Sequence, residues 1–133
     1  MGAMADDTVA LILAWHHAVN AGHTAEALAL SSPDIRVGGP RGSAAGHAVF
    51  AEWIGSAGIT LTPRVIHVGA RAFYVEQDAR WASNTDPGVA AIHTCTVFEV
   101  SDGLVAAVLR YDALPDALEA MGDEVSSTIW SAA

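Results

Sequence analysis

The residues best suited to chemistry in this sequence are Arg110 and Asp112, which stand two positions apart in a segment of alternating character. Side chains two residues apart on a strand point to the same face of the sheet. An arginine beside an aspartate can hold the carboxylate ionised while the carboxylate moves a proton or orients a substrate oxygen. The spacing therefore makes Arg110 and Asp112 the candidate catalytic residues. The alternative is a partly exposed ion pair with little energetic weight.

A second signal is a polar residue on a strand face that is otherwise apolar. Gln77 shares its predicted face with Phe73, and Thr96 shares its face with Phe98. A buried polar group needs a partner from the protein, from water or from a ligand. Gln77 and Thr96 are therefore candidate ligand-orienting residues. We predict an apolar lining around these two residues, and each of its members can equally belong to the core. The predicted lining residues are Trp15, Phe50, Trp53, Phe73 and Phe98.

The six histidines do not form a metal-binding motif, so we predict no metal and no other cofactor. His16 and His17 are adjacent on a predicted helix and point about 100° apart. His16 and His67 are the candidates for contact with a ligand, against the alternatives of core burial or solvation. His93 falls on the face opposite Thr96 and should lie outside any pocket.

The elements that must position these residues follow from hydrophobic periodicity and turn signals. Helical spacing comes first along the chain and alternation follows, which indicates an α+β fold with helices over one face of an antiparallel sheet. The predicted helices cover 6–21, 25–30, 47–54 and 114–121, and the predicted strands cover 35–37, 60–68, 71–82, 90–100 and 104–111. The sequence predicts a glycine-rich loop over 38–46, turns over 84–88 and at Ser101–Gly103, and a loose tail over 126–133 that Trp130 could anchor.

The amino-acid composition argues against several classes of binding partner. The formal net charge is −9, which disfavours nucleic acid and excludes a polybasic membrane patch. No apolar stretch is long enough to span a bilayer, and no secretion signal is evident. The single cysteine, Cys95, fits a reducing compartment. We therefore expect a cytoplasmic protein with one domain over 6–121, a cloning remnant and disordered start over 1–5, and a tail over 122–133.

Four segments in the expected order resemble the SnoaL-like branch of the nuclear transport factor 2-like superfamily. They are AWHHAVNAG at 14–22, DIRVGGPRG at 34–42, GHAVFAEW at 46–53 and FEVSDGLVAAVLRYD at 98–112. The resemblance implies a cone-shaped curved antiparallel sheet wrapped on three N-terminal helices, with one internal pocket for a small apolar molecule. It also implies a homodimer, formed through an outer sheet face that carries Tyr74, Cys95 and Val97.

The catalytic groups of that superfamily are largely replaced in this chain. Trp15, Gly39 and Thr96 stand where its ketosteroid isomerases carry their polar groups, and Gln77 and Ala79 stand where its epoxide hydrolases carry an Arg and an Asp. Only Asp112 matches an acid/base position of the hydrolases and cyclases. The resemblance thus implies a small-molecule binding protein, with isomerase, cyclase or hydrolase chemistry left open. The alternative is a non-catalytic accessory or dimeric binding module.

Overall fold

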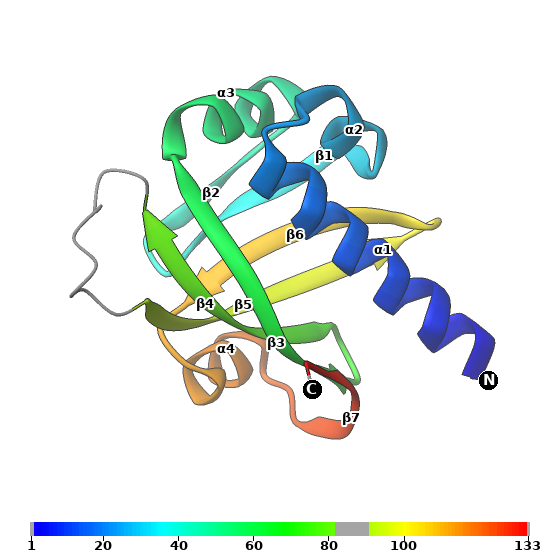
Figure 1. Ribbon diagram of the computed structural model, residues 1–133. Coiled ribbons are helices and arrows are strands. Elements are labelled where there is room, and N and C mark those ends of the chain that lie inside the picture. Colours follow the sequence, from blue (N-terminus) through cyan, green and yellow to red (C-terminus); the bar gives the residue numbers. More distant parts are fainter. Residues whose placement is uncertain (1, 82–90, 133) are drawn as a thin grey trace.

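The protein consists of one curved, unclosed sheet with helices on both faces (Figure 1). Its structure is a computed structural model that describes residues 2–81 and 91–132. The helices are α1 (Gly2–Ala21), α2 (Thr24–Ala29), α3 (His47–Ala57) and α4 (Leu114–Met121). The strands are β1 (Ser31–Gly39), β2 (Gly42–Ala45), β3 (Ile59–Gly69), β4 (Phe73–Trp81), β5 (Ile92–Ser101), β6 (Leu104–Tyr111) and β7 (Val125–Ser131). The predicted α+β class and curved sheet are confirmed.

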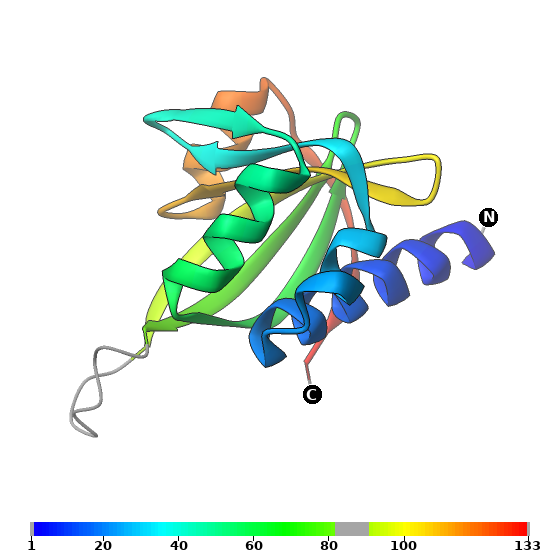
Figure 2. The same ribbon diagram turned by 90° about the horizontal axis from the view of Figure 1, so that it is seen from above.

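The strand order is β2-β1-β6-β5-β4-β3-β7. Every neighbouring pair is antiparallel except β1 and β6, which run parallel; β2, α3 and β3–β5 lie between these two strands in the chain. Figure 2 shows α1, α2 and α3 on one side of the sheet and α4 on the other. The three N-terminal helices thus cover the concave face, as the resemblance implies.

Strand alternation sorts the side chains of the central strands between two clusters. Val75 and Phe98 pack with Ile12 and Trp15 of α1 on the concave face. Tyr74 and Val97 pack with Ala117 of α4 on the convex face. Each face of the sheet therefore buries its own group of apolar side chains, as the two-residue alternation along a strand predicts.

The β5–β6 hairpin turns at the predicted site. Asp102 and Gly103 both have positive φ angles, 53° and 75°. Such angles match the twist of a tight hairpin and favour Asp-Gly or Asn-Gly pairs. The predicted turn and the bounds of β6 and α4 are confirmed, whereas the predicted turn at 84–88 lies outside the described residues.

The glycine-rich segment at 38–46 is more ordered than predicted. β1 continues to Gly39, and β2 folds back on it from Gly42 to Ala45. A Cβ atom on Gly39 would stand 2.5 Å from the carbonyl oxygen of Arg110. The missing side chain therefore allows β1 to lie directly against β6, and the prediction of a loop over the whole segment is wrong.

The prediction of a loose tail is also wrong. β7 pairs with β3 and completes one edge of the sheet, with Trp130 opposite Ile66 and packed against the concave-face core. Asp123 fixes the approach to β7 by accepting hydrogen bonds from the backbone N–H groups of Ala70 and Arg71 and from the Tyr74 hydroxyl. Desolvation opposes ionisation of Asp123, but these bonds outweigh it and lower the pKa of its carboxyl group to about 2.

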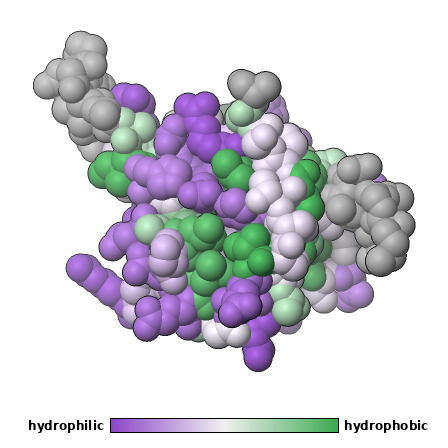
Figure 3. Space-filling view, turned by 90° about the horizontal axis from the view of Figure 1, so that it is seen from below, coloured by the Kyte–Doolittle hydropathy of each residue, from purple (hydrophilic) through white to green (hydrophobic). Residues whose placement is uncertain are grey.

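The convex face bears on the predicted dimer. Tyr74, Cys95 and Val97 are fully buried, because α4 of the same chain lies over them. The apolar face on which the dimer prediction depended is therefore already covered within one chain. Figure 3 shows the underside of the molecule, where apolar side chains gather in one area and hydrophilic side chains surround them.

Candidate ligand-binding cavity

A cavity of about 870 Å³ opens between the β1–β2 hairpin, α3 and the concave face of β3–β6. Its walls are mostly apolar, and its polar side chains separate into an exposed group and a buried group. The lining residues are Val37–Gly42, Val49, Trp53, Ile59, Leu61, Trp81, Ile92, Thr94, Thr96, Val108, Arg110, Tyr111 and Asp112. The buried members of this set mark the inner end of the cavity, and the exposed members mark its mouth.

The mouth carries the predicted catalytic residues. Arg110 and Asp112 both line it and both are exposed. No ion pair joins them in the described part of the chain; instead the Arg110 guanidinium carbon lies 5.3 Å from the centroid of the Trp81 ring, a cation–π distance. Arg41 is a further lining cation. Two arginines and one carboxylate therefore line the mouth of the cavity in a strongly acidic protein.

The inner end is lined by Leu61, Thr94, Thr96 and Val108, all of them buried. The Thr96 hydroxyl donates a hydrogen bond to Oε1 of Gln77, with the oxygens 2.6 Å apart. Thr94 Oγ1 lies 3.4 Å from the same oxygen. Gln77 is fully buried and stands behind the threonines rather than in the cavity wall. Thr96 is thus the predicted polar residue that lines the cavity, and Gln77 supports it.

His16 lies behind Gln77. One ring nitrogen, Nδ1, is 2.7 Å from the carbonyl oxygen of Ile12, and the other, Nε2, is 2.6 Å from the amide nitrogen of Gln77. Burial lowers the pKa of His16 to about 4, although its bond to the Ile12 carbonyl raises it in part. His16 is therefore neutral at physiological pH, and it does not line the cavity.

Most of the predicted aromatic lining is core. Trp15 stacks on Phe50 with ring centroids 5.6 Å apart and meets the edge of Phe98 at 5.1 Å, and Phe73 packs against the same cluster. Only Trp53 of the predicted aromatic set lines the cavity. Among the residues described, the Trp15 indole N–H is the only buried side-chain polar atom without a hydrogen-bond partner.

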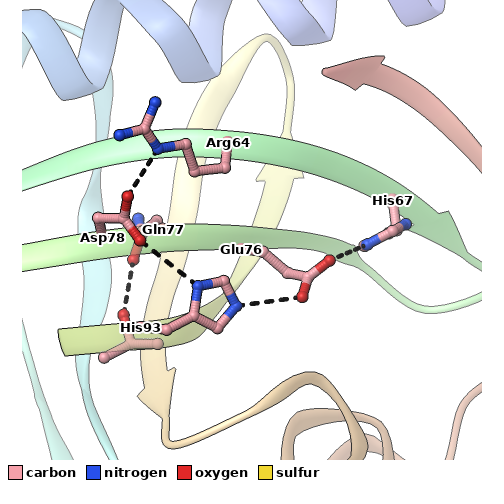
Figure 4. A network of polar contacts seen from close by, with 7 residues as sticks. Arg64, His67, Glu76, Gln77, Asp78 and His93 are labelled. Carbon is pink, nitrogen blue, oxygen red and sulfur yellow. Dashed lines mark hydrogen bonds and ion pairs between the residues drawn. The ribbon is translucent and has the colours of Figure 1, made fainter. Parts of the chain in front are cut away.

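His67 lies on the opposite face of the sheet. Its Nε2 atom is 2.7 Å from Glu76, which also contacts His93 at 3.2 Å, and Asp78 joins His93 to Arg64 (Figure 4). The hydrogen bond from His67, and a further one from His93, lower the pKa of Glu76. This convex-face ladder ties β3, β4 and β5 together. In the described ranges no group of three or more His, Cys, Asp or Glu side chains is placed to hold a metal ion.

Sequence reasoning missed Arg41 and Trp81 as lining residues. Alternation places Trp81 on the same strand face as Gln77, but its position next to the mouth depends on how far the sheet curves. Arg41 sits between β1 and β2, in the segment predicted to be a glycine-rich loop. Its charge beside glycines was the only available signal.

Comparison with solved structures identifies the fold of this chain. No protein-family model matches this sequence, and no curated protein matches it. Many solved structures do match. The epoxide hydrolase/cyclase-like enzyme SalBIII, which acts in pyran ring formation in the polyether salinomycin, has a TM-score of 0.69 at 17% identity, over 87% of this chain and 97% of that one.

Two further structures have the same arrangement. A candidate ketosteroid isomerase from Kribbella flavida has a TM-score of 0.66 at 21% identity, over 79% of this chain and 76% of its own. A nuclear transport factor 2-like protein of unknown function from Cytophaga hutchinsonii has a TM-score of 0.65 at 14% identity, over 76% of this chain and 85% of its own. The chain therefore has the nuclear transport factor 2-like fold, as its sequence predicts. Among the described residues no helix combines the length and apolar character needed to cross a bilayer.

Proposed function

We propose that this protein binds a small, mainly apolar molecule in the cavity between α3 and the concave face of the sheet. The observation that carries the proposal is a space of about 870 Å³ with apolar walls and few polar groups, the usual composition of a small-molecule site. Arg110 and Asp112 are proposed to contact the end of the ligand that lies at the mouth. Structural neighbours include cyclase-like and isomerase-like proteins, which supports a site of this kind.

Acid/base catalysis at Asp112 is the second candidate. It is favoured by one observation: Asp112 lines the cavity, two residues along the strand from Arg110. Against it, the buried end of the cavity lacks an ionisable side chain in the described part of the chain, since His16 stands behind Gln77. Binding without catalysis is therefore the function we favour, and a single carboxylate carries the alternative.

The test is a thermal-shift screen with terpenoid epoxides, steroids and aromatic polyketides. A compound that binds only the native state raises the melting temperature by mass action. Val49 is exposed and lines the cavity from α3, whereas Ala48 is exposed on the same helix and does not line it. We expect Val49→Trp to abolish the shifts and Ala48→Trp to retain them. Equal shifts in both variants, or none in the wild type, would refute the proposed site.

Mass spectrometry of the hits separates binding from catalysis. Under the binding proposal, each hit persists unchanged after prolonged incubation with the wild-type protein. Consumption that stops in Asp112→Asn and continues in Asp34→Asn, an exposed aspartate outside the cavity, would establish catalysis at Asp112 instead.

A homodimer and a cytoplasmic location remain part of the proposal. The dimer is supported only by the resemblance and by the apolar area on the underside (Figure 3). Light scattering tests it directly: a dimer has twice the chain mass of 13.7 kDa at micromolar concentration, and a monomer would overturn it.

The cytoplasmic location is supported by a single, buried cysteine. Cell fractionation tests it.

A further inference from the structure

The direction of the hydrogen bonds behind the cavity can be derived from one fixed point. The carbonyl oxygen of Ile12 can only accept, so the 2.7 Å contact with His16 requires a proton on Nδ1 of the ring. His16 is 2% exposed and surrounded by the aromatic core, where an imidazolium would have no counter-charge. The ring is therefore neutral and carries this single proton, which leaves Nε2 as an acceptor.

The next bond follows from the first. Since Nε2 of His16 accepts, the Gln77 atom 2.6 Å away must be the amide NH₂, which donates. The other end of the Gln77 amide is then Oε1, an acceptor, and it points toward β5. One helix carbonyl thus fixes both the imidazole tautomer and the orientation of the Gln77 amide.

The chain ends at the cavity wall. Thr96 has a single hydroxyl proton, and Oε1 of Gln77 takes it at 2.6 Å. The Thr96 oxygen is left with its lone pairs for any group that enters the cavity. Thr94 repeats this orientation more weakly, at 3.4 Å. Both threonines are buried lining residues, so they define the polarity of the inner end.

The donors among the lining side chains lie elsewhere. The Arg41 and Arg110 guanidinium groups belong to exposed residues, and Trp53, Trp81 and Tyr111 are half-buried. The remaining members of the inner end, Leu61 and Val108, have no polar side-chain atoms. The unpartnered Trp15 indole N–H belongs to the core cluster and not to the lining set. The cavity is therefore polarised, with side-chain acceptors inside and cations at its mouth.

We propose that the inner end of this cavity selects a ligand whose buried end carries a hydrogen-bond donor, such as a hydroxyl group, over the same skeleton ending in a carbonyl or an ether. The inference rests on the proposed function and names the ligand class for it. A carbonyl oxygen at this end would face the Thr96 lone pairs and leave a buried acceptor unpaired, which costs free energy. A hydroxyl group would donate to Thr96 and keep the whole chain of bonds intact.

Matched probes test this selectivity. Borneol and camphor share one skeleton and differ in a hydroxyl against a carbonyl group, and 2-naphthol and 2-methoxynaphthalene differ in a hydroxyl against an ether. We expect calorimetry to give the hydroxyl member of each pair roughly tenfold tighter binding. Thr96→Val removes the stronger of the two acceptors at nearly constant shape and should markedly reduce this preference. Thr62→Val, on an exposed strand position outside the cavity, should retain it.

The outcomes separate the two proposals. One contrary result is that camphor and 2-methoxynaphthalene bind at least as tightly as their hydroxyl partners and lose this binding in Val49→Trp. That result would leave the cavity as the binding site and refute the inference that its inner end presents hydrogen-bond acceptors. Failure of all four probes and of naphthalene would refute both.

A spectroscopic measurement is independent of any ligand and of the stability of Thr96→Val. Nitrogen-15 NMR of histidine-labelled wild-type protein at pH 7 distinguishes the two neutral tautomers and the cation. We expect His16 to be neutral with its proton on Nδ1. A proton on Nε2, or on both nitrogens, would make His16 the donor to Gln77 and would turn the Gln77 NH₂ group toward Thr96. That result would overturn the inference while leaving the proposed function untouched.

Discussion

Nε2 of His16 on α1 lies 2.6 Å from the side-chain amide nitrogen of Gln77 on β4, so two buried polar residues join the N-terminal helix to the middle of the sheet. The residues are 61 positions apart in the chain, and one polar atom of each has its partner only when the other residue is in place. A buried pair of this kind specifies how α1 docks, because any shift along the sheet leaves polar atoms without partners.

The buried imidazole should make stability depend on pH. The pKa of His16 falls from 6.5 to about 4 on folding, so the unfolded chain binds a proton that the native protein does not. The resulting stability is fully present above pH 6.5 and is lost as the pH falls toward 4. The expected loss is about 3 kcal/mol, measured by urea unfolding at a series of pH values.

The control for this prediction is His17→Gln, since His17 is exposed on the same helix. It should reproduce the wild-type pH profile. Asp123 and the other carboxylates with lowered pKa values act at more acidic pH, so the window between pH 6.5 and 5 reports on His16. A flat profile across that window would contradict the prediction.

Two glycines offer a matched test of the β1–β6 contact. Gly39→Ala places a methyl group 2.5 Å from the Arg110 carbonyl oxygen, and we expect a loss of about 1–3 kcal/mol in unfolding free energy. Gly55 lies in α3 with nothing within 4 Å of its added Cβ. Gly55→Ala should therefore stabilise the protein by about 0.5–1 kcal/mol. Equal effects of the two substitutions would show that β1 does not pack this closely.

Trp130 tests the role of β7. Its side chain is half-buried against the concave-face core, so Trp130→Ala should lower the free energy of unfolding by about 2 kcal/mol. Ser131 is exposed on the same strand, and Ser131→Ala should change stability little. Equal stability of the two variants in denaturant unfolding would show that the Trp130 side chain contributes nothing to the core.

Cys95 should be chemically inert in the native protein. Burial, with a smaller contribution from the charge of Glu76, raises the pKa of its thiol to about 12. Because the thiolate is the reactive form, a thiol reagent such as DTNB at pH 8 should find no reactive group until denaturant is added. Rapid labelling of the folded protein would contradict the buried position of Cys95 under α4.

The sequence was sufficient where a structural choice is local. Asp102 and Gly103 adopt the left-handed angles that a hairpin needs, so the turn and the start of β6 could be predicted from two residues. Alternation placed Thr94, Thr96 and Phe98 on one face of β5, and Cys95 and Val97 on the other. These properties depend on the backbone period and on residue type, which are the same in any context.

The site itself required tertiary structure. Gln77 and Thr96 look equivalent as polar residues on an apolar face, yet Thr96 lines the cavity and Gln77 is sealed behind it by His16. Alternation fixes the face of a strand but not which positions along it the helices fill. That depends on where α1 and α3 dock, through contacts between residues distant in the chain.

The positions of β7 and α4 also depend on tertiary contacts. The segment at 125–131 contains strand-favouring residue types but no regular alternation. It becomes β7 because β3 offers an unpaired edge and the core offers a place for Trp130. α4 was predicted within its exact bounds, but nothing in its sequence specified that it would cover Tyr74, Cys95 and Val97. Local periodicity determines which elements form, and long-range burial determines where they pack and which polar groups remain open to a ligand.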